Sequence, residues 1–304
     1  MAALFDAYIM VDWSAAAKPV TGPNSIWIGI LAKDARLKLQ FRSVNPETRL
    51  KARAFIDDMV GKLTKRGDKV LLGFDFSFGY PSGTAGALGL DTSGTPPWKA
   101  IHDHIAGKVR EKPDNSNARF AIAAGMNYAI SRGPYPFWGA PAKDQVNTLG
   151  GKRAAFDKDA PLAEFRLVEQ QMRQEKLGQP KSAWQLAYAG SVGSQMLLGI
   201  PHVHALRDSL PNARLWPYET GLTALTDESL DDIDVVIAEV YPSLLDVKPA
   251  PGQTLDAAQV EAIARHYADL DAKERLGALF AGHATLDSTQ IVMIEREEGW
   301  ILGV

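Results

Sequence analysis

The sequence contains no cysteine among its 304 residues. This absence excludes disulfide bonds, iron–sulfur clusters, thiolate zinc sites and cysteine nucleophiles. It is typical of proteins of the reducing cytoplasm, where we expect this chain to be located. The chain also lacks an apolar run of about 18 residues, and no basic stretch precedes its first apolar segment. We therefore predict neither a membrane span nor a signal peptide.

Several common enzyme motifs are missing as well. The sequence has no GxxxxGK[ST], no GxGxxG after a predicted strand, no GxSxG and no HExxH. Nucleotide hydrolysis of the P-loop type, simple dinucleotide binding, serine hydrolase chemistry and zincin chemistry therefore lose their usual sequence support.

The chain has no excess of positive charge, since its formal net charge is −3. Binding along a nucleic acid relies on many lysine and arginine contacts to phosphates, so nucleic acid is only weakly supported as a partner. Residues 132–181 hold nine Lys/Arg and six Asp/Glu, whereas residues 226–274 hold three and twelve. This pattern suits a negatively charged substrate that cations bridge to an acidic site, and solvated surface charge explains it equally well. The sequence does not indicate whether the chain forms oligomers.

What the chain does contain is the composition of a globular α/β protein, with 46% hydrophobic and 23% charged residues. Short apolar or alternating runs at residues 7–11, 25–31 and 37–44 predict three antiparallel strands in series. A helical stripe over residues 46–64, with Asn45 as its N-cap, then leads to the apolar run KVLLGFDF. Because a helix that joins two strands of one sheet normally sets them parallel, the sheet is predicted to be mixed.

The second half of the chain is less regular. We expect helices over residues 161–177 and 182–198, a fifth strand in DVVIAEVYP, and a helix over residues 255–281 that bends or divides near Asp271. The final VMIEREEGWILGV is predicted to form two short β segments. The fold class is therefore α/β, a mixed five-stranded sheet flanked by helices in a single domain over residues 1–304. Residues 82–234 form a long, mostly helical insertion after the fourth strand.

Three carboxylates stand at or near the ends of β-prone runs: Asp12 in YIMVDWSA, Asp75 in VLLGFDFSFGYP and Glu239 in VVIAEVYPS. Carboxyl ends of parallel strands meet at one edge of a sheet, and neighbouring strands lie about 4.8 Å apart. Oxygen ligands without cysteine suit Mg²⁺ or Mn²⁺. The three side chains are therefore candidate metal ligands and candidate catalytic residues. An acid at a strand end is also a common turn former or helix N-cap, and each one alone fits that interpretation.

The same residues carry a resemblance to known proteins. A three-strand meander, a helix, a parallel strand, and acids on strands one and four together resemble the ribonuclease H fold. The phrases VDWSA, GFDFSFGYP and AEVYPS are similar to those of the DUF429 family of predicted ribonuclease H-like nucleases of uncharacterised function. The resemblance implies a further acid from a C-terminal helix, for which Asp269 and Asp271 are available and Asp271 is the favoured candidate. A solvated acidic face of that helix explains both residues equally well.

Four further residues are candidates for substrate binding. Ser14 and Lys18 follow the first carboxylate in a loop. Lys181 and Gln185 stand one turn apart at the start of the predicted helix 182–198, and they line the site if this helix crosses its mouth. A surface loop explains the first two equally simply. For the chain as a whole we expect a Mg²⁺- or Mn²⁺-dependent nuclease. The alternatives are a phosphotransferase or ATPase of the actin-like class, or a non-catalytic protein that binds a ligand or partner on the same core.

Overall fold

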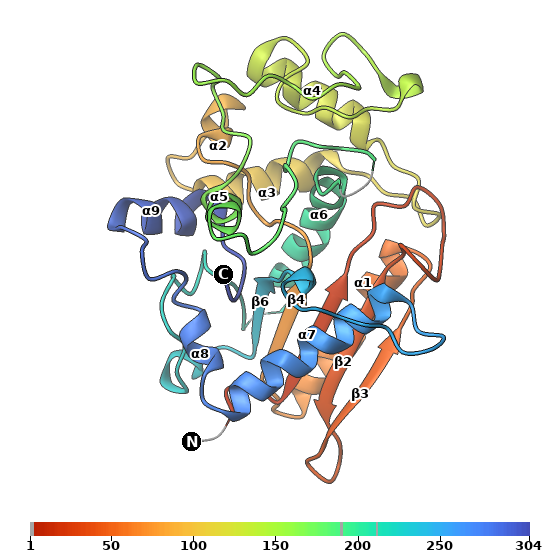
Figure 1. Ribbon diagram of the computed structural model, residues 1–304, viewed down its shortest axis with the longest axis vertical. Coiled ribbons are helices and arrows are strands. Elements are labelled where there is room, and N and C mark those ends of the chain that lie inside the picture. Colours follow the sequence, from red (N-terminus) through yellow and green to blue (C-terminus); the bar gives the residue numbers. More distant parts are fainter. Residues whose placement is uncertain (1–2, 189–190, 211) are drawn as a thin grey trace.

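A mixed sheet of six strands forms the centre of the α/β fold in the computed structural model, which describes residues 3–188, 191–210 and 212–304 (Figure 1). The strand order is β3-β2-β1-β4-β6-β5. The prediction of a five-stranded sheet therefore missed one strand. The extra strand, β5, is three residues long and pairs in parallel with β6 at the sheet edge, and so short a strand leaves no periodic signal in the sequence. The strands are β1 (Ala7–Asp12), β2 (Trp27–Lys33), β3 (Leu39–Val44), β4 (Val70–Phe74), β5 (Ala213–Leu215) and β6 (Val235–Glu239).

The first three strands form the predicted antiparallel meander, and β1 also pairs in parallel with β4. Helix α1 (Arg49–Lys65) makes the connection between β3 and β4. Its N-cap is Thr48, whose side chain accepts a hydrogen bond from the Lys51 backbone N–H, so the prediction of Asn45 was wrong. The Asn45 side chain instead binds the backbone of the loop that precedes β2.

Both faces of the sheet are covered, which explains why β1 is apolar without alternation. Ile9 and Val11 belong to a core with α1 and α6 (Gly193–Ser209), whereas Tyr8 and Met10 belong to a second core with α7 (Leu255–Ala272). Successive side chains of a strand point to opposite faces, so each face has its own layer of helices. Figure 1 shows α7 running across the strands on one face.

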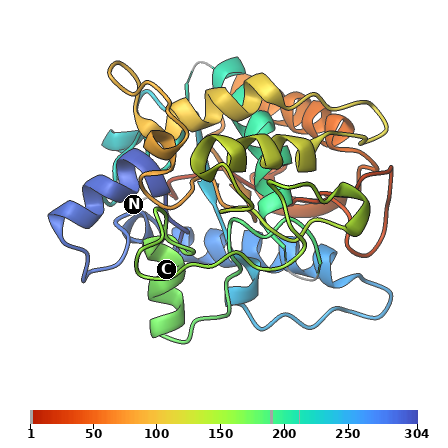
Figure 2. The same ribbon diagram turned by 90° about the horizontal axis from the view of Figure 1, so that it is seen from above.

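Apart from β5 and α6, most of the segment between β4 and β6 lies beyond one end of the sheet (Figures 1 and 2). The helix expected over residues 161–177 begins only at Leu167, because Arg166 and Glu169 form a capping box there. The helix expected over residues 182–198 begins at Gly193, since the backbone of Trp184 and Leu186 pairs with Trp138 instead. Besides α6, this segment contains α2 (Thr84–Ala87), α3 (Pro97–Lys108), α4 (Arg119–Ser131), α5 (Leu167–Gln174) and the short 3₁₀ helices Ala142–Asp144 and Glu228–Leu230.

The C-terminal part is helical rather than β. A 3₁₀ turn, Pro242–Leu244, follows β6, and α7 ends at Ala272 before α8 (Leu276–Leu279), so the expected division near Asp271 is confirmed. The β segments predicted at the C-terminus were wrong. They are replaced by α9 (Ser288–Met293) and a π-helical turn, Ile294–Glu298, after which Ile301 forms one bridge with Glu239. No helix in the described residues combines the length and apolarity needed to cross a membrane.

Candidate active site

Asp12 and Asp75 lie side by side at one edge of the sheet. Asp12 is the last residue of β1, and Asp75 directly follows β4. The two strands are parallel with Val11 opposite Phe74, so both acids stand at the carboxyl end. The backbone N–H of Trp13 donates to Asp75 Oδ1 at 2.7 Å, and the two carboxyl groups are within hydrogen-bonding reach of each other. The β1 and β4 strands thus create a pair of adjacent carboxyl groups.

The pair is electrostatically strained. Burial, followed by the charges of Asp75 and Asp256, raises the pKa of Asp12 well above its ordinary value. Burial also raises the pKa of Asp75 to about 7, although the Trp13 N–H opposes the shift. Within the part of the chain that the structure describes, neither carboxyl group forms an ion pair with lysine or arginine. Protonation or a bound cation relieves such a pair, since two neighbouring carboxylates repel each other.

A third acid, Asp256, lies beside this pair and was missed in the sequence analysis. It occupies the first turn of α7, and its Oδ2 accepts a hydrogen bond of 2.7 Å from the backbone N–H of Asn24. Its charge contributes to the raised pKa of both Asp12 and Asp75. A signal for it was present, because the phrase Leu-Asp-Ala occurs both at residues 255–257 and at residues 270–272.

Asp271 belongs to the second of these phrases and lies at the other end of the sheet. Its carboxylate accepts hydrogen bonds from the backbone N–H groups of Leu4 and Phe5, both at 2.9 Å, and from the Tyr8 hydroxyl at 2.6 Å. These donors stand at the start of β1, whereas Asp12 stands at its end. The structure therefore does not bring Asp271 to the other candidate acids. It anchors the N-terminal segment to α7.

Glu239 ends β6 at the same edge as Asp75 but has its own partner. The guanidinium of Arg166 donates to both of its oxygens, at 2.7 and 2.8 Å, and the backbone N–H of Phe78 donates to one of them. Arg166 is fully buried and also pairs with Glu169. Burial lowers the pKa of Arg166, but the charges of Glu169 and Glu239 outweigh it and raise that pKa well above its ordinary value. Burial raises the pKa of Glu239 in spite of Arg166. Because the Arg166 guanidinium occupies both of its oxygens, this acid fits a structural role better than the predicted metal ligation.

A cleft of about 450 Å³ opens over the three aspartates. Of the predicted substrate-binding residues, Ser14 and Lys181 line it. Lys18 is exposed and does not line it, and the Gln185 side chain donates to the Ala187 carbonyl instead. The other lining residues are Trp13, Ala15, Asn24, Gln179, Tyr188, Ser191, Val192, Gln195, Tyr241 and Ser243.

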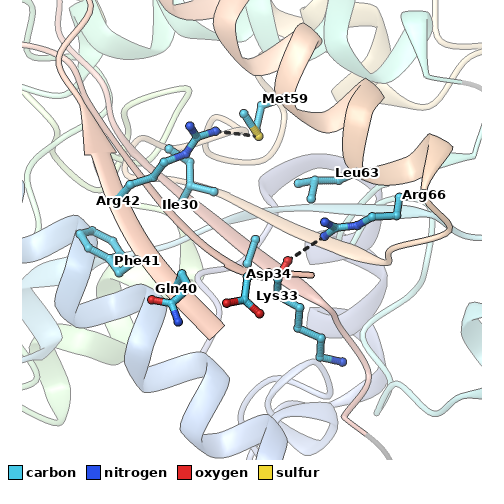
Figure 3. A pocket seen from close by; sticks show the side chains of 10 residues that line it. Ile30, Lys33, Asp34, Gln40, Phe41, Arg42, Met59, Leu63 and Arg66 are labelled. Atoms are coloured by element: carbon cyan, nitrogen blue, oxygen red, sulfur yellow. Dashed lines mark hydrogen bonds between the residues drawn. The ribbon is translucent and has the colours of Figure 1, made fainter. Parts of the chain in front are cut away.

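Another concave surface, of about 250 Å³, lies between β3 and α1 (Figure 3). Its polar groups are engaged with each other, since Arg42 contacts the Met59 sulfur at 3.3 Å and Arg66 donates to the Lys33 carbonyl at 3.0 Å. Lys33 lies at the end of β2 that is next to the start of β1. This surface is therefore remote from the aspartates, and none of the candidate site residues lines it.

The donor set suits a hard divalent cation that is completed by its ligand. Among the described residues, no group of three or more His, Asp or Glu side chains is arranged to hold a metal ion. Mg²⁺ commonly takes only one or two protein carboxylates and fills its other positions with water and substrate phosphates. Asp12 and Asp75 supply two such carboxylates, half-buried at the cleft and without a cationic partner in the described chain. These two residues fit the ion, whereas Glu239 is occupied by Arg166.

Comparison with known proteins gave no match to this chain among family models, curated proteins or solved structures.

Proposed function

We propose that the chain is a Mg²⁺- or Mn²⁺-dependent phosphodiesterase of the ribonuclease H-like class that acts on nucleic acid. The observation that carries the proposal is the Asp12–Asp75 pair, with Asp256 beside it, in a cleft at the carboxyl end of two parallel strands. Ligand sites of open α/β sheets form outside the carboxyl ends of their strands, where loops supply side chains.

The order of the strands supports this class. An antiparallel meander of β1, β2 and β3, followed by a helix and a β4 strand parallel to β1, is the arrangement expected for a ribonuclease H-like core. The resemblance of the sequence around Asp12 and Asp75 points in the same direction. The additional strand β5 lies at the far edge and leaves this arrangement unchanged.

The residues of the chain have distinct parts in this reaction. Hydrolysis forms a P–O bond to a water oxygen and breaks the P–O bond to the leaving ester oxygen, which takes a proton. A bound divalent cation would supply electrostatic stabilisation of the charge on the phosphoryl oxygens. Asp12 and Asp75 would hold that cation, and Trp13 fixes the orientation of Asp75 through its backbone N–H. Asp256 adds negative charge beside the pair.

Cleavage assays on purified single-site variants test the proposal. Asp12→Asn and Asp75→Asn are each expected to lower Mn²⁺-dependent cleavage of single-stranded DNA or RNA by about a hundredfold or more, because each removes a ligand charge. Asp232→Asn is the matched control, since Asp232 is exposed and precedes β6 at the opposite end of that strand. Cleavage by both site variants at the wild-type rate would rule out the proposed site.

A binding measurement gives a second readout that does not depend on activity. Mn²⁺ is expected to raise the melting temperature of the wild type and of Asp232→Asn, because a ligand that binds only the folded state stabilises it. The Asp12→Asn/Asp75→Asn double variant should show no such rise. If ATP stabilises the wild type and is hydrolysed while nucleic acid is not cleaved, the chain belongs instead to the phosphotransferase or ATPase class.

A further inference from the structure

The cleft over the aspartates is lined from two parts of the chain besides the sheet. Trp13, Ser14 and Asn24 come from the connection between β1 and β2. Lys181 and Gln195 come from the segment between α5 and the first turn of α6. The two parts are tied together, because the Gln195 side chain donates to the Trp13 carbonyl at 2.5 Å. The site is therefore a bounded cleft rather than an open face of the sheet.

The charge of the lining restricts what enters. Three aspartates line the cleft, and Lys181 is the only lysine or arginine among its described lining residues. Each phosphate that a protein neutralises needs its own cationic contact, and a long stretch of backbone needs several. A lining with one cationic side chain suits one phosphate in addition to the phosphate at the aspartates.

The size of the cleft also favours a small ligand. Its volume of about 450 Å³ lies within the range of small-molecule sites, about 300–1,000 Å³. Surfaces that recognise duplex DNA bury roughly 1,000–2,500 Å² of protein. A volume of this size suits a ligand as small as one nucleotide, and the single cleft does not provide the broad surface on which a duplex is recognised.

Two tyrosine side chains also line the cleft. Tyr188 lines the cleft with 64% of its surface exposed, and Tyr241 lines it from the turn after β6. Exposed aromatic rings stack on unpaired bases without regard to sequence. Tyr188 and Lys181 thus offer a base contact and a phosphate contact on the same segment.

Resting on the proposed function, we propose that the substrate is the end of an unpaired nucleic-acid strand, which enters the cleft one nucleotide at a time. Lys181 pairs with a phosphate of this strand, and Tyr188 stacks on a base. The enzyme then removes nucleotides from free ends, and strands without ends are poor substrates.

Matched linear, circular and duplex molecules test this restriction. A linear single strand, the same strand closed into a circle, and its blunt duplex are incubated with the protein and Mn²⁺, as DNA and as RNA. We expect cleavage of the linear strand, with terminal products, at a rate at least about a hundredfold above that of the circle. Equal rates on the linear and circular strands would overturn the inference while leaving the proposed function intact. If none of the three is cleaved, the proposed function fails and the inference fails with it.

Binding is measured by the fluorescence anisotropy of a labelled linear strand, with Ca²⁺ in place of Mn²⁺ to slow hydrolysis. Tyr188→Ala should weaken binding about fivefold or more. The wild type should lose affinity only weakly with salt, with a log–log slope near −0.7 for one phosphate contact, and Lys181→Gln should remove most of that slope. Lys158→Gln is the control, because Lys158 is an exposed lysine of the same insertion that does not line the cleft. A wild-type slope steeper than about −3, or equal binding of the circle and the linear strand, would contradict the inference.

Discussion

Helix α7 carries an aspartate near each end, and the two have opposite surroundings. Asp256 lines the cleft and is partly exposed, next to the Asp12–Asp75 pair. Asp271 is only 2% exposed, and its oxygens accept hydrogen bonds from Leu4, Phe5 and Tyr8. The same Leu-Asp-Ala phrase thus serves a candidate site at one end of the sheet and holds the chain together at the other. The partners of an acid, rather than its local sequence, determine which part it has.

Two acids at the carboxyl ends of the neighbouring strands β4 and β6 also differ in their partners. Asp75 after β4 and Glu239 at the end of β6 both follow buried apolar runs. Arg166 donates to both oxygens of Glu239, and no such partner faces Asp75 in the described residues. Because Arg166 comes from the insertion, the Glu239 pair also ties the insertion to the sheet. The comparison separates acids that stabilise the fold from acids that are left for a ligand.

Replacement of Arg166 should produce the largest effect. Arg166→Met leaves Glu239 and Glu169 buried without their cation, and removal of one partner from a buried ion pair costs about 3–5 kcal/mol. Urea unfolding monitored by circular dichroism measures this loss. Arg153→Met is the control, because the Arg153–Glu164 ion pair is exposed on the arginine side and its loss should cost less than about 1 kcal/mol. Equal losses in the two variants would contradict a structural role for the buried pair.

Asp75→Asn should stabilise the metal-free protein at neutral pH. The folded protein holds the pKa of Asp75 at about 7, above its ordinary value, so folding favours the protonated form. The stability of the wild type should therefore fall as the pH rises from about 4 to 7, by up to about 4 kcal/mol, and the amide should flatten this dependence. Unfolding free energies measured across this pH range with a chelator present test the prediction. Parallel pH profiles for the variant and the wild type would count against it.

Asp271→Ala should destabilise the fold by about 2–3 kcal/mol, because it removes the acceptor of the Leu4 and Phe5 N–H groups and leaves the Tyr8 hydroxyl only its longer bond to the Phe5 carbonyl. The cleavage rate per folded molecule should not change, since Asp271 binds residues at the start of β1, whereas Asp12 stands at the end of that strand. Thermal unfolding and cleavage rates on the same preparation separate the two effects. A rate loss at full folding would place Asp271 in the active site after all.

Asp256→Asn should have the smallest effect. It removes one negative charge beside the pair while leaving an oxygen to accept from Asn24, so the unfolding free energy should change by no more than about 0.5 kcal/mol. The metal-dependent rate is expected to fall about tenfold, with a higher Mn²⁺ concentration needed for half-maximal activity. A Mn²⁺ titration of the cleavage rate makes the measurement. If Asp256→Asn matches the wild type, the site consists of Asp12 and Asp75 alone.

The sequence by itself determined much of the fold. Alternation and apolar runs located the first three strands and β4, and the helical stripe of α1 between them predicted the parallel pairing of β1 with β4. These are local patterns of period two and 3.6, which a sequence displays directly. The same patterns put Asp12 and Asp75 at corresponding ends of parallel strands, because the meander sets β3 parallel to β1 and the helix α1 then joins β3 to β4.

Only the tertiary structure decided which other acids join them. Nothing local distinguishes Asp256 from Asp271, since both follow a leucine and precede an alanine in one helix. The two aspartates have different surroundings because α7 crosses the sheet. Its first turn lies near the carboxyl end of β1, and its last turn lies near the start of β1. Glu239 pairs with Arg166, which is far away in the sequence, and such a pairing across an insertion leaves no local pattern.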